Sequence, residues 1–202
     1  MTRRPALGPA TAALSALLAL TACQASPEAG RPNTTPTSPT ATPTPTAPST
    51  PEWTPEQQAA ITAAKARYTA ARAAIDKAML APTKATRTDL EKAGNGGSWI
   101  LTILQDILNF EDYGWYQTGN TKITNTMVTS VKLDLQQPEV RMVSCIDSSA
   151  VVIRFQKDGK PVPTGPGNGN RQKFSSQLVY APPAPGGQKM WWLIADKAMG
   201  AC

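Results

Sequence analysis

Histidine is absent from this 202-residue sequence, and cysteine occurs only three times. Without an imidazole, the chain cannot form a Ser-His-Asp or Cys-His catalytic site, and it has no histidine base that titrates near neutral pH. The same absence excludes histidine-containing zinc sites, and three cysteines are too few for an all-cysteine tetrahedral site. The acidic residues also lack the spacing of a calcium loop. We therefore expect neither a metal nor a cofactor.

Charged residues are also scarce: Lys, Arg, Asp and Glu make up 17% of the chain, with a formal net charge of +6. The basic residues are not clustered, and a set such as Lys84, Arg87 and Lys92 is typical of a solvated surface. The glycine-rich run at residues 165–169 lacks the strand-to-helix context of a phosphate-binding loop. The sequence therefore predicts no nucleic-acid partner.

The N-terminus has the parts of a secretory signal. Arg3 and Arg4 form a basic start, an alanine- and leucine-rich stretch covers about residues 10–20, and small residues precede Cys23. The apolar stretch is shorter than the roughly 18–20 residues that a spanning helix needs. Residues 1–22 are therefore predicted to be a signal peptide, with an uncleaved N-terminal anchor as the alternative. The residues after Arg4 match a twin-arginine signal poorly, which favours general secretion.

The residues Leu20, Thr21, Ala22 and Cys23 resemble the lipobox of bacterial lipoproteins. This resemblance implies cleavage between Ala22 and Cys23, lipidation of the Cys23 thiol and acylation of the new amine. Because two or more acyl chains anchor a protein stably, we expect an extracytoplasmic protein that is lipid-anchored to the cell membrane. The alternative is an ordinary secreted protein in which this cysteine occurs by chance.

Proline, threonine, serine and alanine dominate residues 26–52, which contain no large apolar side chain. Such a segment cannot bury enough surface to offset the entropy of ordering. Residues 23–53 are therefore predicted to be the lipidated cysteine and a disordered tether, which at about 3.1 Å per residue would extend roughly 80 Å. Removal of residues 1–22 lowers the formal net charge from +6 to +4, because Arg3 and Arg4 leave with them.

The folded domain is expected to cover residues 54–202 and to begin with three helices. Thr54 and Gln57 form a capping box, and apolar residues then recur with helical spacing for about 25 residues. A second capping box at residues 88–91 predicts a short helix that Gly94 ends. Apolar residues between positions 99 and 108 predict a third helix, more hydrophobic than the first.

Beyond residue 120, apolar residues alternate with polar ones, which is typical of half-buried strands. Strands are predicted at residues 122–135, 140–147, 151–155, 174–180 and 190–196, with a short edge strand at 113–116. In the first of them the odd-numbered positions are expected to face the core. Helices followed by a meander of strands predict an α+β fold, with the helices on one face of an antiparallel sheet.

Two cysteines remain once Cys23 is lipidated. In an oxidising extracytoplasmic compartment, Cys145 and Cys202 are predicted to form a disulfide. A redox-active thiol pair is the alternative, which the lack of a Cys-x-x-Cys spacing disfavours.

These features together resemble the NTF2-like lipoproteins and secreted proteins of actinobacteria. The resemblance covers residues 54–202 and rests on the lipobox, the Thr/Pro tether, the run Ser144-Cys145-Ile146-Asp147 and the terminal Gly200-Ala201-Cys202. It implies a cone-shaped fold with a curved sheet, and a bridge from the Cys-x-Asp strand to the C-terminal cysteine. The loops at residues 163–170 and 182–188 are long for this group.

The resemblance also implies a ligand pocket or an active site, because NTF2-like cones often hold a small apolar ligand and some are isomerases, dehydratases or cyclases. Such an enzyme needs a carboxylate in an apolar cavity and a hydroxyl donor opposite it. Asp147 is the catalytic candidate, and its alternative role is structural, either hydrogen-bonded to the backbone or paired with a base such as Arg141 or Arg154. The candidates for a pocket lining are Tyr113, Trp115, Tyr116 and Asp196.

The leading hypothesis is a membrane-anchored surface lipoprotein whose domain binds a small apolar ligand or an envelope protein without catalysis. One alternative is an isomerase- or dehydratase-type enzyme that uses Asp147. The other is a structural or interaction module of the cell envelope, in which the protein's own side chains fill the cone. A homodimer formed through the sheet, as in many proteins of this fold, is a further expectation.

Overall fold

The computed structural model describes residues 52–163 and 170–202. The predicted signal peptide, Cys23 and the tether up to residue 51 lie outside the described residues, as does the glycine-rich run at 165–169. Within the described part of the chain, no helix is both long enough and apolar enough to cross a membrane.

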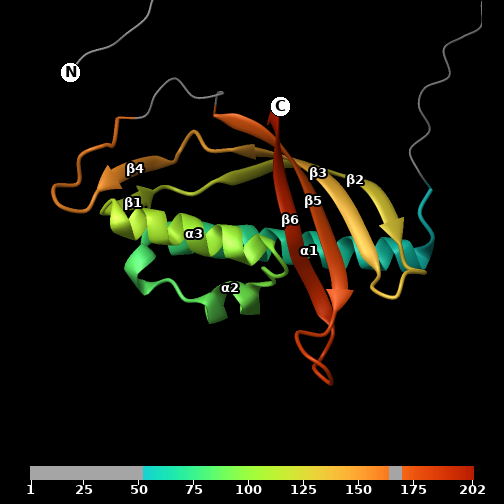
Figure 1. The fold of residues 1–202 in the computed structure, drawn as a ribbon. Coiled ribbons are helices and arrows are strands. Elements are labelled where there is room, and N and C mark those ends of the chain that lie inside the picture. Colours follow the sequence, from blue (N-terminus) through green and yellow to red (C-terminus); the bar gives the residue numbers. More distant parts are fainter. Residues whose placement is uncertain (1–51, 164–169) are drawn as a thin grey trace, which may run out of the picture. The chain divides into compact units, whose positions relative to one another are not determined.

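Three α-helices and one short 3-10 helix open the domain (Figure 1): α1 (Pro55–Leu80), η1 (Pro82–Lys84), α2 (Arg87–Ala93) and α3 (Trp99–Asp112). The predicted capping box at the start of α1 is confirmed, because the Gln57 amide donates to Thr54 Oγ1 at 3.2 Å and the Thr54 amide donates to Gln57 Oε1 at 3.0 Å. The predicted start of α2 is wrong. Thr86, not Thr88, caps this helix, since its hydroxyl accepts the Asp89 amide at 3.1 Å and donates to the Asp89 carboxylate at 2.7 Å.

Six strands follow: β1 (Trp115–Thr118), β2 (Lys122–Lys132), β3 (Glu139–Asp147), β4 (Val152–Phe155), β5 (Arg171–Ala181) and β6 (Met190–Ala201). Four of them form an antiparallel sheet in the order β2-β3-β5-β6, whereas β1 and β4 pair with each other. The fold is therefore α+β, as predicted. The single meander is a wrong prediction, because β4 leaves the main sheet.

The separate β1–β4 pair arises from a bend in one antiparallel ribbon. Thr118 pairs with Val152 and Lys122 pairs with Asp147, so only short connections separate the two halves of the ribbon. At the bend, Gly119 has a φ of 74°, and a Cβ there would collide with the carbonyl of Ala150. Glycine therefore permits the close approach of the two chains.

The predicted alternation in β2 is only partly correct. Two bulges, between Ile123 and Asn125 and between Val128 and Ser130, shift the side chains by one position each time. As a result Met127 is 59% exposed, whereas Val128 packs against the core. The strand also ends at Lys132, three residues before the predicted limit.

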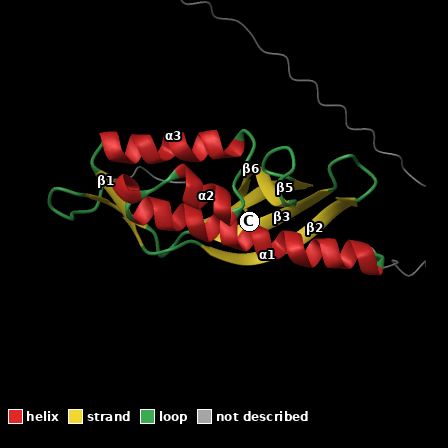
Figure 2. Ribbon diagram, turned by 90° about the horizontal axis from the view of Figure 1, so that it is seen from below, coloured by secondary structure: helices red, strands yellow, loops and turns green. Residues whose placement is uncertain are grey.

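The hydrophobic core has two parts, which α1 connects. The N-terminal half of α1 packs on the inner face of the main sheet, where Ile61 and Ala64 lie in one cluster with Val140 and Leu178. Its C-terminal half packs with α2 and α3 in a second cluster that contains Leu90, Ile103 and other apolar residues. Figure 2 shows α1 lying across one face of the strands, with α3 at the margin of the domain.

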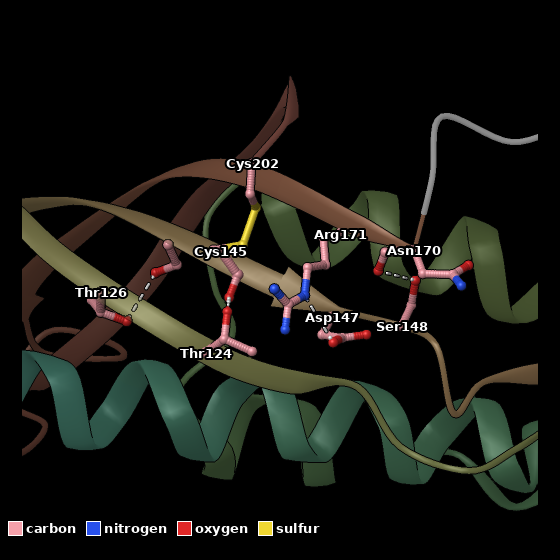
Figure 3. Close-up of a disulfide and its surroundings, with 9 residues drawn as sticks. Thr124, Thr126, Cys145, Asp147, Ser148, Asn170, Arg171 and Cys202 are labelled. Atoms are coloured by element: carbon pink, nitrogen blue, oxygen red, sulfur yellow. Dashed lines mark hydrogen bonds and ion pairs between the residues drawn. A yellow bond between two sulfur atoms is a disulfide. The ribbon is translucent and has the colours of Figure 1, made fainter.

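A disulfide joins Cys145 on β3 to Cys202, which follows β6, with a Cα–Cα distance of 5.9 Å (Figure 3). This prediction is confirmed. Because β5 lies between β3 and β6 in the sheet, the bridge connects strands that are not hydrogen-bonded neighbours. It therefore ties the last strand to the middle of the sheet.

Replacement of Cys202 by Ser is expected to lower the free energy of unfolding by about 4 kcal/mol, since the bridge closes a loop of about 58 residues in the unfolded chain. Urea unfolding of the oxidised protein and of the Cys202→Ser and Cys145→Ser variants measures this loss. The two variants should agree with each other and should not respond to reducing agent. A variant as stable as the oxidised protein would contradict a structural role for the bridge.

Candidate functional site

A row of polar side chains crosses the interior between α1 and the main sheet. We call it the polar layer, and it consists of Tyr68, Arg72, Ser144, Ser176 and Asp196. Arg72 Nη1 donates to Asp196 Oδ2 at 2.9 Å, and the Ser176 hydroxyl donates to Asp196 Oδ1 at 2.7 Å. The Asp196 side chain is completely inaccessible to solvent, and that of Arg72 is 12% exposed. The polar layer thus joins the first helix to the last strand.

Two polar atoms of this layer have unused hydrogen-bonding capacity. The Tyr68 hydroxyl lies close to Ser144 and Ser176 but makes no hydrogen bond of good geometry, and Arg72 Nε is likewise buried without an acceptor. Arg72 also lies over the ring of Phe174, with its guanidinium carbon 5.0 Å from the ring centroid. The cation is therefore held by one carboxylate and one aromatic face.

Burial controls the ionisation of this layer. Burial raises the pKa of Asp196 above its usual value, although the Arg72 guanidinium and the Ser176 hydroxyl act in the opposite direction. Burial also raises the pKa of the Tyr68 hydroxyl, and the nearby Asp196 carboxylate adds to this effect. A carboxylate and a phenol with raised pKa values inside a protein are groups that catalytic sites use.

A groove of about 580 Å³ opens beside the polar layer, between α1 and the β1–β2 connection. We call it the α1–β2 groove, and its lining residues are Thr69, Arg72, Ala73, Asp76, Lys77, Leu80, Asn120, Thr121, Lys122 and Ile123. Arg72 belongs to both the groove and the polar layer. The charges on its walls are three cations, Arg72, Lys77 and Lys122, against the single carboxylate of Asp76.

That carboxylate is occupied by structural hydrogen bonds. Asp76 accepts from the Thr121 amide at 3.0 Å, from the Thr121 hydroxyl at 2.8 Å and from Gln117 Nε2 at 3.1 Å. Asp76 therefore fixes the bend of the ribbon against α1. Its charge is spread over three donors, which leaves the groove with a cationic surplus.

The surroundings of Asp147, the predicted catalytic residue, do not fit this role, which requires a carboxylate in an apolar cavity. It is half-buried on the outer face of β3, beside the disulfide, where Arg171 Nε donates to it at 3.1 Å and the Ser149 amide at 2.9 Å (Figure 3). Hydrogen bonds from Ser149 and from Arg171 lower the pKa of Asp147 to about 2. Its geometry supports the structural alternative. The expected backbone hydrogen bond is present, from the Ser149 amide, whereas the basic partner is Arg171 rather than Arg141 or Arg154.

The remaining predicted site residues lie in separate places. Tyr113 and Trp115 stack on each other beyond the end of α3, with ring centroids 4.7 Å apart. Tyr116 lies on β1, opposite Arg154. Asp196 alone belongs to the polar layer. None of the four lines the α1–β2 groove.

Sequence reasoning missed Tyr68, Arg72 and the two serines, although a signal for the serines exists. Ser144 and Ser176 occupy positions of β3 and β5 that alternate with buried apolar residues such as Met142 and Leu178, so both side chains face the core. Polar residues at inward positions mark a designed polar contact or a binding site. Arg72 carries no comparable signal in the sequence.

The described residues hold no group of three or more Cys, Asp or Glu side chains that could bind a metal ion. No protein-family model matches this chain, and no curated protein matches it. Among solved structures, the intermembrane space region of the chloroplast protein ARC6 is similar with a TM-score of 0.47 and 8% sequence identity. That match covers 75% of this chain and 100% of the other.

The Arg72→Gln substitution is expected to reduce the free energy of unfolding by about 3–5 kcal/mol, because it leaves the buried Asp196 carboxylate without its cation. The double variant Arg72→Gln/Asp196→Asn should recover most of this loss, since no uncompensated charge remains. Urea unfolding of the two single variants and the double variant provides the cycle. Arg87→Gln is the matched control, because it removes an exposed ion pair with Glu91 and should cost only about 0.3–0.5 kcal/mol. Additive effects of the two substitutions would contradict the coupling.

Proposed function

We propose that this chain is a lipoprotein of the cell envelope whose NTF2-like domain binds a small amphipathic anion in the α1–β2 groove, without catalysis. Cys23 holds the protein on the membrane, and residues 24–53 separate the domain from the lipid surface. The ligand has an apolar body and a carboxylate or a similar anionic group. One observation carries the proposal: Arg72 lines the groove, and its guanidinium is held by an ion pair with the buried Asp196 carboxylate.

The arrangement of the elements supports an NTF2-like cone. Three helices precede the strands, α1 lies across the inner face of the main sheet, and the bent ribbon β1–β2 and β3–β4 extends past it (Figure 1). In a cone of this kind the ligand site lies between the long helix and the concave face of the sheet. Here the polar layer fills the centre of that space, and the α1–β2 groove remains at its open end.

The chemistry of the groove supports an amphipathic anion. Ala73, Leu80 and Ile123 offer an apolar surface, and Lys77 and Lys122 place ammonium groups at the rim. Arginine that is already oriented by a carboxylate needs little further ordering to bind a second anion through its free edge. The hydroxyls of Thr69 and Thr121 already donate to the Lys65 carbonyl and the Asp76 carboxylate, so the cationic side chains are the groups that would bind the anion.

The enzymatic alternative would require Asp196 rather than Asp147. Asp196 has the buried surroundings and raised pKa of a catalytic carboxylate, and Tyr68 would be its hydroxyl donor. However, the Asp196 side chain has no exposed surface, and Arg72 and Ser176 occupy both of its oxygens. A general base must reach the proton that it removes, so this geometry supports binding over catalysis.

The Cys23→Ser substitution is expected to move the protein from the membrane fraction to the soluble fraction, since the acyl chains provide the anchor. Fractionation of the host cells followed by immunoblotting measures the distribution. A variant that remains in the membrane fraction would refute lipidation at this residue.

Ligand binding is tested with 8-anilinonaphthalene-1-sulfonate, an anionic aromatic probe, and with the neutral N-phenyl-1-naphthylamine. The anionic probe should bind more tightly, and Lys122→Gln should weaken its binding by up to about fivefold, as expected for loss of one exposed charge. The neutral probe should respond little to this substitution. Fluorescence titration of the purified protein gives both dissociation constants.

The control for this titration is Lys84→Gln. Lys84 lines a different groove of about 480 Å³ between α1 and α2, whose lining includes five alanines and three lysines; one of these lysines, Lys77, also lines the α1–β2 groove. Weaker binding in Lys84→Gln with unchanged binding in Lys122→Gln would place the probe in that second groove and would contradict the proposed site. Native mass spectrometry of the protein from its own host should also reveal a bound anion.

A further inference from the structure

One side of the exposed face of α3 carries a line of leucines that no described element covers. Ile100, Ile103 and Ile107 point into the domain and are almost completely buried. On the adjacent face, Leu101 is 58% exposed and Leu108 is 51% exposed, with the half-buried side chain of Leu104 between them. We call Leu101, Leu104 and Leu108 the α3 stripe.

The spacing of the α3 stripe fits contact with another helix. Residues 101, 104 and 108 follow the i, i+3, i+7 pattern that places side chains along one line of an α-helix. Glu111 continues the same line toward the C-terminal end of α3. Figure 2 shows α3 at the margin of the domain.

The charges of α3 oppose its own dipole. Its first turn has no acidic residue, and Ser98 makes no side-chain capping bond, so the positive end of the helix lacks a negative partner. Its last turn carries Glu111 and Asp112 and no basic residue, which places two carboxylates at the negative end. None of the ion pairs in the described part of the chain includes either carboxylate. An antiparallel partner helix would correct both ends, because opposite charges of the two helices would then lie side by side at each end.

From this complementarity we infer that α3 packs antiparallel against α3 of a second copy, in a two-fold symmetric dimer. Leu101 of one copy then lies opposite Leu108 of the other, and the symmetry axis passes near Leu104 and Gln105. The carboxylates of Glu111 and Asp112 lie beside the N-terminal turn at Ser98 of the other helix. The same face serves both partners, as a closed two-fold interface requires.

A dimer formed through α3 fits the structure better than a dimer formed through the main sheet. The outer face of the main sheet carries charged side chains on its central strands, such as Arg141, Lys173 and Arg171, and Met127 is its exposed apolar residue on β2. The α3 stripe by contrast joins three leucine side chains. A helix of 14 residues is about 21 Å long, so the contact is small and the dimer should depend on concentration. Confinement to a membrane, which rests on the proposed function, would strengthen it.

The test is crosslinking of the full-length protein in membranes from its host. Gln105→Cys places a thiol next to the symmetry axis, and the native Cys145 and Cys202 are bonded to each other. A short bis-maleimide should then give a covalent dimer on a denaturing gel. Asp106→Cys is the matched control, because it is the next residue in the helix but faces away from the α3 stripe, and it should give no dimer above background.

A second pair of variants separates the two possible interfaces. In the Gln105→Cys background, Leu101→Ser/Leu108→Ser should reduce the yield of dimer by about tenfold or more, whereas Met127→Ser should leave it unchanged. All three side chains are more than half exposed, so the fold should tolerate these changes, and circular dichroism verifies this. Equal crosslinking at positions 105 and 106, or loss of the dimer in Met127→Ser alone, would overturn the inference. Probe binding at the α1–β2 groove should be the same in all of these variants, so failure of one proposal does not imply failure of the other.

Discussion

The buried contact between Arg72 and Asp196 is the constraint that organises this domain. Taking a carboxylate and a guanidinium out of water is unfavourable unless both are paired and further hydrogen-bonded. Ser176 supplies the second bond to Asp196, and the ring of Phe174 supplies a face for the cation. Because these partners come from α1, β5 and β6, the pair fixes the position of the long helix on the sheet. It also fills the centre of the domain, which leaves space for a ligand only at the edge.

The two ends of the main sheet are held by different means. The apolar cluster around Val140 and Leu178 holds one end through the non-directional attraction of buried hydrocarbon, and the disulfide from Cys145 holds the other from the outer face. Asp76 fixes the bend of the ribbon against α1 through three hydrogen bonds. The α1–β2 groove lies between that bend and the ion pair. Both contacts hold the walls of the groove in place, which would lower the entropic cost of binding the proposed ligand.

Much of this architecture could be predicted from local signals. The capping box at Thr54, the left-handed glycine at 94 and the pairing of two distal cysteines depend on neighbouring residues or on counting, so sequence reasoning found them. The bulges in β2 and the departure of β4 depend on how the strands meet across the bend at Gly119, which no local pattern encodes. The candidate site was missed for the same reason. Tyr68 and Arg72 are unremarkable residues of a helix until tertiary packing places them against Ser144 and Asp196.

The interior of the domain is closed around Asp196, whose side chain is inaccessible to solvent, and the proposed ligand would bind beside it. Titration of the aspartate carboxyl carbons by NMR tests this most directly, because Asp147 provides an internal reference on the outer face of the same sheet. The account predicts that Asp196 titrates above its usual value, whereas Asp147 titrates at about 2. An Asp196 carboxyl that titrates at its usual value would indicate a solvated carboxylate, and the interior would then be open rather than closed.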